Sequence, residues 1–377
     1  MRHHIFLFTM DVTLDGGVER VVSNMANSFS QRGYQVNIIS LFKANQGLKY
    51  QIESNIKVKY LFNDNSFDTW RQHLLIKSNL YWRYKLAVKF TSELYAYIDG
   101  ELKNNETAVV LWNSYLITPL YGHKNVHIIG LDHSRYPFCN MVKGLRHKLH
   151  TYMVGKFDII TTLNDNEIVK WQSIGRPVYV MPNFLPVDNI DKQYSVPKRA
   201  KIILSMGRMN TNQKGFDRLI DAYSLIAKKF PDWKLVIYGS GSLQHLYRKQ
   251  IKDLQMQDYI EIYDFTTEPQ KIYHTASVYA MCSREEGFPM VLLEAGSQGL
   301  PLVAYDIEFG PKTIIKQGET GFVVSNGDKI MFAEALECLM SNEQLRQKIS
   351  DNIRQDIPAR FSEKVIMNQW EKIIKSL

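Results

Sequence analysis

The chain reads Cys-Ser-Arg-Glu-Glu-Gly-Phe-Pro-Met-Val-Leu-Leu-Glu-Ala-Gly-Ser-Gln-Gly-Leu-Pro-Leu-Val-Ala-Tyr from residue 282 to residue 305. Apolar segments typical of buried strands lie just before this stretch, at residues 277–281, and at its end, at residues 301–305. Between them, Pro289 suits the first turn of a helix, where its missing N–H leaves no hydrogen bond unmade. The stretch therefore predicts a strand, a loop, a helix and a second strand, the unit from which α/β folds are built.

The same alternation of strands and helices extends over the whole chain. Strands are predicted at residues 5–8, 35–41, 108–112, 127–131, 158–162, 201–206, 234–238, 259–263, 277–281 and 302–304. Segments with helical periodicity separate them, and one such segment carries Val18, Val21, Val22, Met25 and Phe29 on a single face. This alternation predicts parallel, doubly wound sheets.

A length of 377 residues favours two domains. The strand series restarts near residue 201, after a loop-like segment at residues 183–199. We therefore predict two Rossmann-like domains, residues 1–185 and 186–360, facing each other across a cleft lined by the carboxyl ends of their strands. The helix at residues 361–377 has one apolar face, which could complete the first domain or cap the second; we assign it to the first.

Composition narrows the class of protein. Hydrophobic residues make up 45% of the chain and charged residues 22%, as in soluble globular proteins. The three cysteines have no close pair, which excludes a disulfide framework and fits a reducing cytosol. We expect neither a signal peptide nor a membrane span, because no apolar run is long enough for either.

The formal charge of +8 is unevenly distributed along the sequence. Residues 1–180 hold 21 basic and 14 acidic residues, whereas the remainder is almost balanced. The first half therefore predicts an anionic partner, and nucleic acid and an anionic membrane both satisfy that description.

Two carboxylates flank the predicted start of the helix after residue 289. Glu286 falls in the loop, and Glu294 falls about one turn into the helix. Free N–H groups at a helix start bind anions, usually phosphate, whereas carboxylates suit the hydroxyl groups of a sugar. The combination predicts a nucleotide-sugar site, although a glutamate near the start of any helix in an α/β protein would produce part of this pattern.

Cationic residues also follow a predicted strand end. Arg208 and Lys214 come after the strand at residues 201–206, where an arginine and a lysine can clamp a diphosphate. No Asp-x-Asp motif and no His or Cys cluster accompanies them, so the sequence gives little support to a divalent metal. These two cations and a helix start could instead neutralise a departing diphosphate.

Three further loops at strand ends contain candidate residues. Gly16 and Gly17 open the first helix, where they either admit a substrate or simply form a tight turn. Gly239 lies in a Gly-Ser-Gly turn, which is a weak nucleotide signal, and His133 follows the strand at residues 127–131. Because the first turn is not Gly-x-Gly-x-x-Gly, a nicotinamide cofactor is not expected.

Together these residues resemble a family-4 retaining glycosyltransferase of the GT-B fold, of the type that builds bacterial envelope or capsular polysaccharide. The resemblance covers most of the chain. It rests on matching order and spacing of the following motifs: Gly16-Gly17-x-Glu19, Gly207-Arg208 with Lys214-Gly215, Glu286 to Glu294 with Gly287-Phe288-Pro289, Gly310-Pro311 and Gly318-x-x-Gly321-Phe322.

The resemblance implies a role for each matching residue. Gly16 and Gly17 would contact the donor phosphate or the acceptor, and His133 the transferred sugar. Arg208 and Lys214 would bind the diphosphate, Glu286 the hydroxyls of the donor sugar, and Glu294 the ribose. The remaining donor-binding residues are Gly239, Phe265, Gly287, Phe288, Pro289, Met290 and Val291. No metal and no other cofactor is implied, because the departing diphosphate itself takes the proton of the acceptor hydroxyl.

The sequence departs from the family pattern in two loops. Asp264 stands before Phe265 where relatives often have glycine, in a loop expected to pass near the nucleotide base. The loop at residues 305–310 is bulkier than the small-residue loop common in the family. Both departures bear on which donor is used.

Basic and aromatic residues are mixed in the first half of the chain. The first run comprises Trp70, Arg71, Lys77, Tyr81, Trp82, Arg83, Tyr84, Lys85 and Lys89, and the second comprises Lys143, Arg146, Lys148 and Lys156. Such segments can lie on an anionic membrane, although a solvated helix face with a buried aromatic stripe would have the same composition. No recognisable nucleic-acid-binding module accompanies them.

We therefore expect a retaining hexosyltransferase that moves a sugar from a nucleotide sugar, with UDP favoured, to a lipid-linked or envelope polysaccharide acceptor. We expect it in the cytoplasm, peripherally attached to the inner face of the cell membrane. The alternatives are another GT-B enzyme, such as a sugar-nucleotide epimerase, and a non-catalytic partner subunit that resembles a glycosyltransferase.

Overall fold

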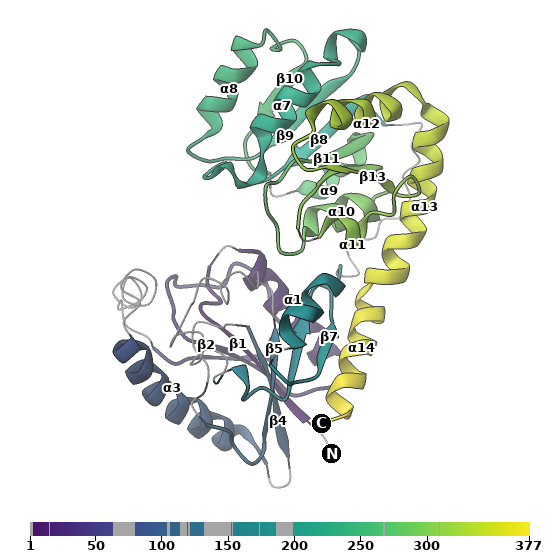
Figure 1. Cartoon of the computed structure of the whole chain (residues 1–377). Coiled ribbons are helices and arrows are strands. Elements are labelled where there is room, and N and C mark those ends of the chain that lie inside the picture. The colour runs from purple at the N-terminus through teal and green to yellow at the C-terminus, as the bar shows by residue number, and fades with distance from the viewer. Residues whose placement is uncertain are drawn as a thin grey trace. The chain divides into compact units, whose positions relative to one another are not determined.

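The structure, a computed structural model, describes residues 3–14, 16–62, 80–103, 106–113, 119, 121–131, 152, 154–172, 174–185, 199–266, 268–308 and 310–377. For residues 80–87 and 170 it describes the backbone only. The chain forms two compact units (Figure 1). The first comprises Met1–Pro182 and Met367–Leu377, and the second comprises Asn183–Ile366. The boundaries predicted from sequence were after residue 185 and at residue 361.

The first unit is built on a parallel sheet of seven strands in the order β3-β2-β1-β4-β5-β6-β7. Its strands are β1 (His3–Thr9), β2 (Val36–Ser40), β3 (Lys57–Tyr60), β4 (Thr107–Trp112), β5 (Val126–Leu131), β6 (Ile159–Thr162) and β7 (Val178–Val180). The helices described here are α1 (Gly17–Gln31), α3 (Leu80–Glu101), α6 (Ile168–Gln172) and α14 (Glu363–Lys375), which begins just before the division. The strand order reverses between β1 and β4, where Leu7 pairs with both Ile38 and Leu111.

The second unit repeats this plan with six parallel strands in the order β10-β9-β8-β11-β12-β13. Its strands are β8 (Ile202–Met206), β9 (Lys234–Tyr238), β10 (Ile260–Tyr263), β11 (Val278–Met281), β12 (Leu302–Asp306) and β13 (Gly321–Ser325). Its α-helices are α7 (Phe216–Ser224), α8 (Gln244–Asp253), α9 (Pro269–Thr275), α10 (Met290–Ser297), α11 (Pro311–Ile314), α12 (Lys329–Ser341) and α13 (Glu343–Phe361). Here the order reverses between β8 and β11, which places a ligand site outside the carboxyl ends of these two strands.

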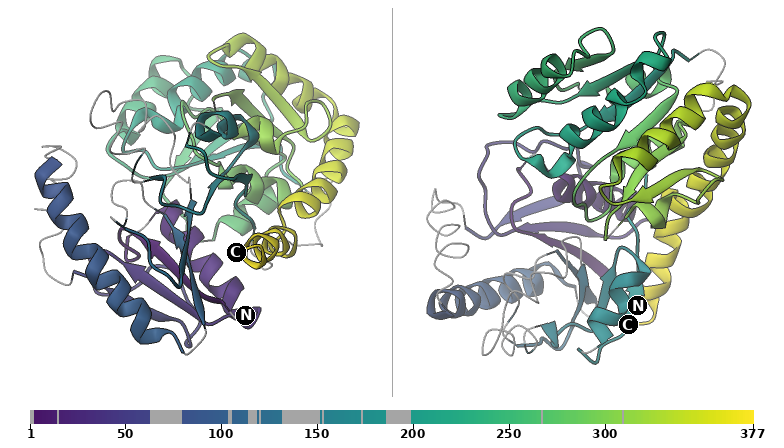
Figure 2. Two further views of the ribbon diagram at one scale, coloured as in Figure 1. Left: turned by 60° about the horizontal axis from the view of Figure 1, so that its bottom comes forward. Right: turned by 45° about the horizontal axis from the view of Figure 1, so that its top comes forward.

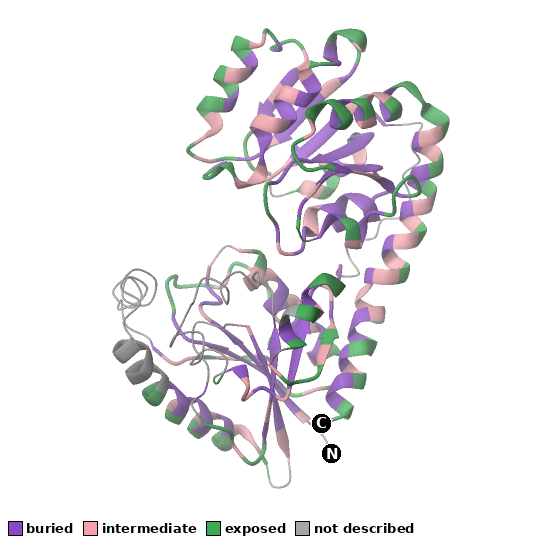
Figure 3. Ribbon diagram, in the orientation of Figure 1, coloured by how far each residue is buried: buried purple, intermediate pink, exposed green. Residues whose placement is uncertain are grey.

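Both sheets are parallel and doubly wound, so the predicted fold class is confirmed. Their central strands are buried on both faces and appear as continuous purple arrows in Figure 3. This explains why the strands are apolar runs instead of alternating patterns. In the first unit, Phe8 of β1 stacks on Trp112 of β4 with 3.9 Å between ring centroids, which ties the two central strands together.

Three strands were not predicted, and all three lie at sheet edges. β3 and β7 end the first sheet, and β13 ends the second. β3 alternates exposed lysines with half-buried residues, β7 has only three residues, and β13 begins at a glycine. Edge strands are covered on fewer sides, so they can be shorter or more exposed than central strands, which weakens the apolar signal.

The segments at which the chain enters and leaves the second unit contact each other. The N–H of Leu185 donates to the carbonyl of Phe361 at 3.0 Å, and Leu185 forms a parallel bridge with Ser362. Only Ser362 separates α13 from α14, and the two helices follow each other in yellow in Figure 2. Within the described ranges, no helix has both the length and the apolar composition required to cross a membrane.

Candidate functional site

The candidate site lies at the carboxyl edge of the second sheet, where the strand order reverses. Gly207 and Arg208 follow β8, and the loop from Cys282 to Pro289 follows its neighbour β11. Adjacent parallel strands bring these two loops together although some 70 residues separate them in sequence. The motifs that the sequence singled out on each loop therefore meet.

Lys214 and Glu286 form an ion pair at the centre of this edge. The Lys214 Nζ donates to Glu286 Oε1 at 2.6 Å, and the two side chains are only 21% and 10% exposed. The hydroxyl of Ser283, itself buried, donates to the same oxygen at 2.6 Å. An ammonium has three donors, so Lys214 can hold Glu286 and still donate to a phosphate.

Two glycines allow Lys214 to reach that position. Gly215 has φ +65°, and a Cβ there would lie 1.9 Å from the carbonyl oxygen of Cys282. A Cβ on Gly207 would lie 2.9 Å from Cγ of Lys214, so the lysine stem passes directly over the bare backbone. Both glycines are therefore required by close approach of the two loops, and Gly215 also by its left-handed conformation.

A second contact fastens the same two loops from outside. Arg284 donates to Asp217 of α7 through both terminal nitrogens, at 2.8 and 2.6 Å, and to the carbonyl of Asn212 at 2.9 Å. Burial raises the pKa of Asp217, but the hydrogen bonds from Arg284 outweigh it and the net pKa is lowered. The bidentate geometry makes this a stronger contact than a single-point ion pair.

The helix start predicted near Pro289 is found one residue later. Pro289 is the N-cap, and α10 begins at Met290, so the prediction that proline occupies the first turn is off by one position. Phe288 packs its ring against Phe361 at 5.9 Å, leaving Met290 and Val291 half-buried at the start of the helix. The first N–H groups of an α-helix have no partners within the helix, so this end can receive an anion.

Glu294 lies on α10 as predicted and is almost buried. Its Oε2 accepts a hydrogen bond from the Tyr273 hydroxyl at 3.1 Å. Gly310 packs against the start of α10, since a Cβ on it would lie 2.3 Å from Cδ of Pro289, and its φ is +103°. The Gly310-Pro311 motif therefore fixes α11 beside the loop that carries Glu286.

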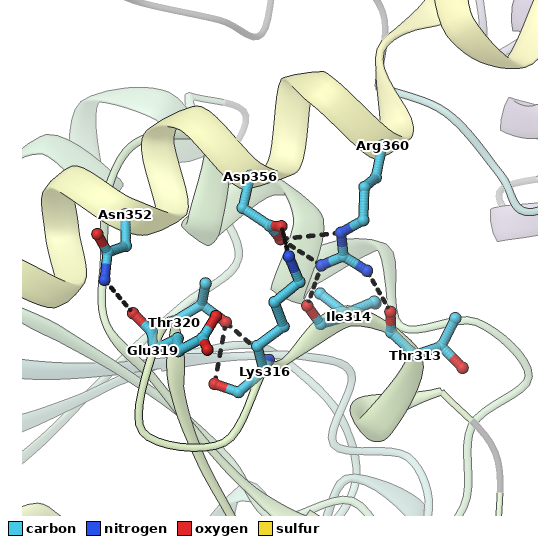
Figure 4. Close-up of polar contacts among 8 residues, drawn as sticks. All are labelled: Thr313, Ile314, Lys316, Glu319, Thr320, Asn352, Asp356 and Arg360. Carbon is cyan, nitrogen blue, oxygen red and sulfur yellow. Dashed lines mark hydrogen bonds and ion pairs between the residues drawn. The ribbon is translucent and has the colours of Figure 1, made fainter.

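A cluster of charges holds α11 from its other end (Figure 4). Arg360 of α13 donates to the carbonyls of Thr313 and Ile314, both at 2.6 Å, which are the last carbonyls of α11. Asp356 accepts from Arg360 and from Lys316, the latter at 2.6 Å. A cation at a helix C-terminus is the favourable arrangement, so this cluster stabilises the short helix behind the site.

The remaining predicted donor-binding residues of this unit lie at the same sheet edge. Arg208 is exposed, and no ion pair or hydrogen bond joins its side chain to any residue that the structure describes. A Cβ on Gly239 would lie 1.9 Å from the carbonyl oxygen of Gly207, so Gly239 has a structural reason to be glycine. Phe265 is 72% exposed, and its N–H donates to the Ser240 hydroxyl at 3.0 Å.

Gly16 and Gly17 lie at the carboxyl edge of the first sheet. Gly16 is the N-cap of α1, and a Cβ on it would lie 2.2 Å from Oε2 of Glu19. Glu19 thus folds back over the helix start, the position that the third helical residue takes in a capping box. The loop before it is fixed by buried Asp11, which accepts hydrogen bonds from Thr13 and Ala44. His133 lies outside the described residues.

Sequence reasoning did not find several residues of the second unit's site. Ser283, Asp217, Arg284 and Tyr273 carry no motif of their own. The pairing of β8 with β11 brings Arg284 to Asp217, whereas Ser283 meets Glu286 within one loop and Tyr273 of α9 meets Glu294 of α10. The one available signal was for Ser283, which lies two residues after a strand and precedes Glu286 by three residues. Among the side chains that the structure describes, no group of three or more His, Cys, Asp or Glu is arranged to hold a metal ion.

Comparison with known proteins gives consistent results. Residues 186–356 match the family Glycosyl transferases group 1. An uncharacterized glycosyltransferase of Haemophilus influenzae is 28% identical over 371 residues, which cover 98% of this chain and 99% of that protein. The amylovoran biosynthesis glycosyltransferase AmsD of Erwinia amylovora is also 28% identical, over 96% of this chain and 97% of its own.

Solved structures agree on the fold. The crystal structure of Anabaena Alr3699/HepE in complex with UDP and glucose superposes with a TM-score of 0.72 over 100% of both chains, at 15% sequence identity. At that identity the match concerns the fold alone.

Proposed function

From the premise that this chain is a glycosyltransferase of the GT-B fold whose residues 186–356 belong to the group 1 family, we propose that it is a retaining hexosyltransferase. Its donor is a nucleotide sugar, and its acceptor is a lipid-linked or envelope polysaccharide. The observation that carries the proposal is the ion pair of Lys214 with Glu286 at the reversal point of the second sheet. It sets a cation for phosphate beside a carboxylate for sugar hydroxyls.

Two relatives support the choice of substrates. AmsD is named for the biosynthesis of amylovoran, and it matches this chain over nearly its whole length, which supports a polysaccharide acceptor. The Anabaena structure contains UDP and glucose, which supports a UDP-hexose as donor.

The reaction requires charge neutralisation more than it requires a base. The bond from the sugar C1 to the diphosphate oxygen breaks, and its electron pair leaves with the diphosphate. The acceptor oxygen bonds to C1 on the same face, and its proton passes to the departing diphosphate. Lys214, Arg208 and the start of α10 would stabilise the negative charge as it develops, while Glu286 holds the sugar. On this account the transfer is metal-independent.

The experiment that tests the proposal begins with the donor. Thermal unfolding of the protein is measured with a panel of UDP-, GDP-, ADP- and TDP-hexoses, because a ligand at 100 times its dissociation constant stabilises the folded state by about 2.7 kcal/mol. The stabilising donor is then incubated with lipid-linked saccharide, with and without EDTA, and the anomeric configuration of the product is read by NMR. An inverted product, or loss of transfer in EDTA, contradicts the proposal.

The same assay separates the two alternatives. Conversion of the nucleotide sugar without acceptor would identify an epimerase. Donor binding without turnover, together with turnover that appears only when a partner subunit is added, would identify a non-catalytic subunit.

We further propose that the first unit attaches to an anionic membrane. Most of the two basic and aromatic runs lies outside the described side chains, but the last lysine of each run is described. Lys89 is exposed and lies over the ring of Phe62 at 5.0 Å, and Lys156 lies over the exposed Tyr152 at 4.6 Å. Phe62 is buried and Lys156 is half-buried, so the exposed cation Lys89 and the exposed aromatic Tyr152 are the described side chains that support attachment.

Vesicle co-sedimentation tests the attachment. Wild type should pellet with vesicles rich in phosphatidylserine, and 0.5 M salt should release it. A variant with Arg83, Lys85 and Lys89 changed to Glu should remain in the supernatant. Equal pelleting of both proteins, or no pelleting at low salt, contradicts the membrane attachment and leaves the sugar transfer untouched.

A further inference from the structure

The two oxygens of the Glu286 carboxylate are not equivalent. Oε1 accepts two hydrogen bonds, from Lys214 Nζ and from Ser283 Oγ, each at 2.6 Å. Within the part of the chain that the structure describes, Oε2 receives none. The carboxylate therefore presents one occupied and one available oxygen, although the residue as a whole is only 9% exposed.

The donor from Ser283 is fixed by burial. Ser283 is 1% exposed, two residues beyond the end of β11, in a segment whose Cys282 carbonyl is covered by Gly215. A buried hydroxyl without a hydrogen bond is costly, and Glu286 is the partner that this one has. The serine thus limits which rotamers Glu286 can adopt.

Lys214 cannot supply this constraint alone. Its ammonium sits at the end of a flexible four-carbon stem, and in the proposed function it must also bind the diphosphate as the donor enters and leaves. A contact from a short, buried side chain three residues away is insensitive to that cycle.

We propose that Ser283 is a positioning residue that holds Oε1 of Glu286, so that Oε2 is the oxygen that accepts hydrogen bonds from the donor sugar. This inference rests on the proposed function. Holding a polar group in place matters because a misplacement of about 1 Å in a closed site can lower the rate by about 10²-fold.

The test compares Ser283→Ala with Ser277→Ala. Ser277 is the matched control, because it is also a buried serine with a hydrogen-bonded hydroxyl. It lies directly before the same strand, at the amino end of the sheet, and its hydroxyl donates to the backbone carbonyl of Ala200 at 2.7 Å. Loss of a buried hydroxyl should lower the melting temperature of both variants. Only Ser283→Ala should lower kcat, by about 10- to 100-fold, with the dissociation constant of the free nucleoside diphosphate changed less than about threefold.

Rescue distinguishes positioning from packing. Ser283→Thr keeps the hydroxyl and should recover most of kcat, whereas Ser283→Cys keeps the size with a weak donor and should behave like alanine. Wild-type kcat in Ser283→Ala, or equal kcat in the threonine and cysteine variants, overturns the inference.

A crystal structure of Ser283→Ala decides the point without any activity. Rotation of Glu286 away from its present rotamer supports positioning, and an unmoved Glu286 overturns it even if the enzyme transfers sugar. If wild type binds no nucleoside diphosphate, the proposed function fails, and the rotamer of Glu286 still decides whether Ser283 positions it.

Discussion

Replacing Lys214 by methionine should affect folding and donor binding together. Methionine keeps most of the aliphatic stem that passes over Gly207, so the packing of the loop is retained while the charge is lost. Glu286 is then left with Ser283 as its one donor from the described residues, in a side chain that is 10% exposed. The variant therefore isolates the value of the charge.

The size of each effect follows from these contacts. Leaving a nearly buried acceptor short of a partner costs about 1–3 kcal/mol, and a domain of this size loses roughly 2–4 °C in melting temperature per kcal/mol. We therefore expect the melting temperature to fall by about 2–12 °C. Loss of one charge-assisted hydrogen bond to the diphosphate, about 1.5–3 kcal/mol, should raise its dissociation constant by roughly 10- to 150-fold.

Arg208→Ala is the matched control. Arg208 is exposed, and the structure gives it no partner among the described residues, so its removal should change the free energy of unfolding by less than about 0.5 kcal/mol. The substitution should still weaken binding of the nucleoside diphosphate more than binding of the free nucleoside. Calorimetric scanning and titration with both ligands measure the two effects separately.

The double variant Lys214→Met with Glu286→Gln tests the ion pair itself. A neutral glutamine beside the methionine has no uncompensated charge, so much of the lost melting temperature should return. The reasoning is refuted if the two substitutions lower the melting temperature additively, or if Lys214→Met melts like Arg208→Ala.

Three further predictions concern the supports of the site and the stability of the first unit. Gly318→Ala should lower the free energy of unfolding by the roughly 1–2 kcal/mol of left-handed backbone strain, because a Cβ there meets no other atom. Gly215→Ala should lower it by more, because its Cβ would also lie 1.9 Å from a carbonyl oxygen. Chemical unfolding compares the two variants, and equal losses would contradict the clash. Arg284→Ala and Asp217→Ala should each lower the free energy of unfolding by about 1 kcal/mol. The double variant should lose scarcely more than Arg284→Ala, since all three variants lose the same contact between Arg284 and Asp217; additive losses in urea would count against this. Burial lowers the pKa of His4 below 6.5, so the unfolded state takes up the proton first and the free energy of unfolding should fall as pH drops below about 6.5. Melting curves should show that His4→Gln loses less melting temperature than wild type over this pH range. An equal loss in both proteins would rule out His4 as the cause of the pH dependence.

Sequence determined the order of buried elements well, for an identifiable reason. Every predicted strand is present because a parallel strand covered on both faces must be an apolar run, as residues 234–238 illustrate. The edge strands β3, β7 and β13 escaped because they are short or partly exposed. Helix boundaries were close where proline marks them, as at Pro289.

The site was predictable as a set of residues and not as a set of contacts. Glu286, Lys214 and Arg208 follow strand ends, and strand ends can be read from sequence. That Lys214 meets Glu286 depends on β8 lying beside β11, and that Ser283 meets the same oxygen depends on side-chain geometry. The bidentate contact of Arg284 with Asp217 joins two ordinary charged residues, which no local pattern distinguishes from solvated ones.

The discontinuity of the first unit has a consequence for biosynthesis. Its last element, α14, buries Met367, Trp370 and Ile374, and Arg32 of the first unit donates to Glu371 at 2.9 Å. The ribosome must translate the whole of the second unit before this helix emerges, which at 5–20 residues per second takes roughly 10–40 s. During that interval the nascent first unit exposes the apolar surface that α14 later covers. Shielding of this surface by a chaperone, or slow folding of the unit as a whole, therefore becomes part of how this protein is made.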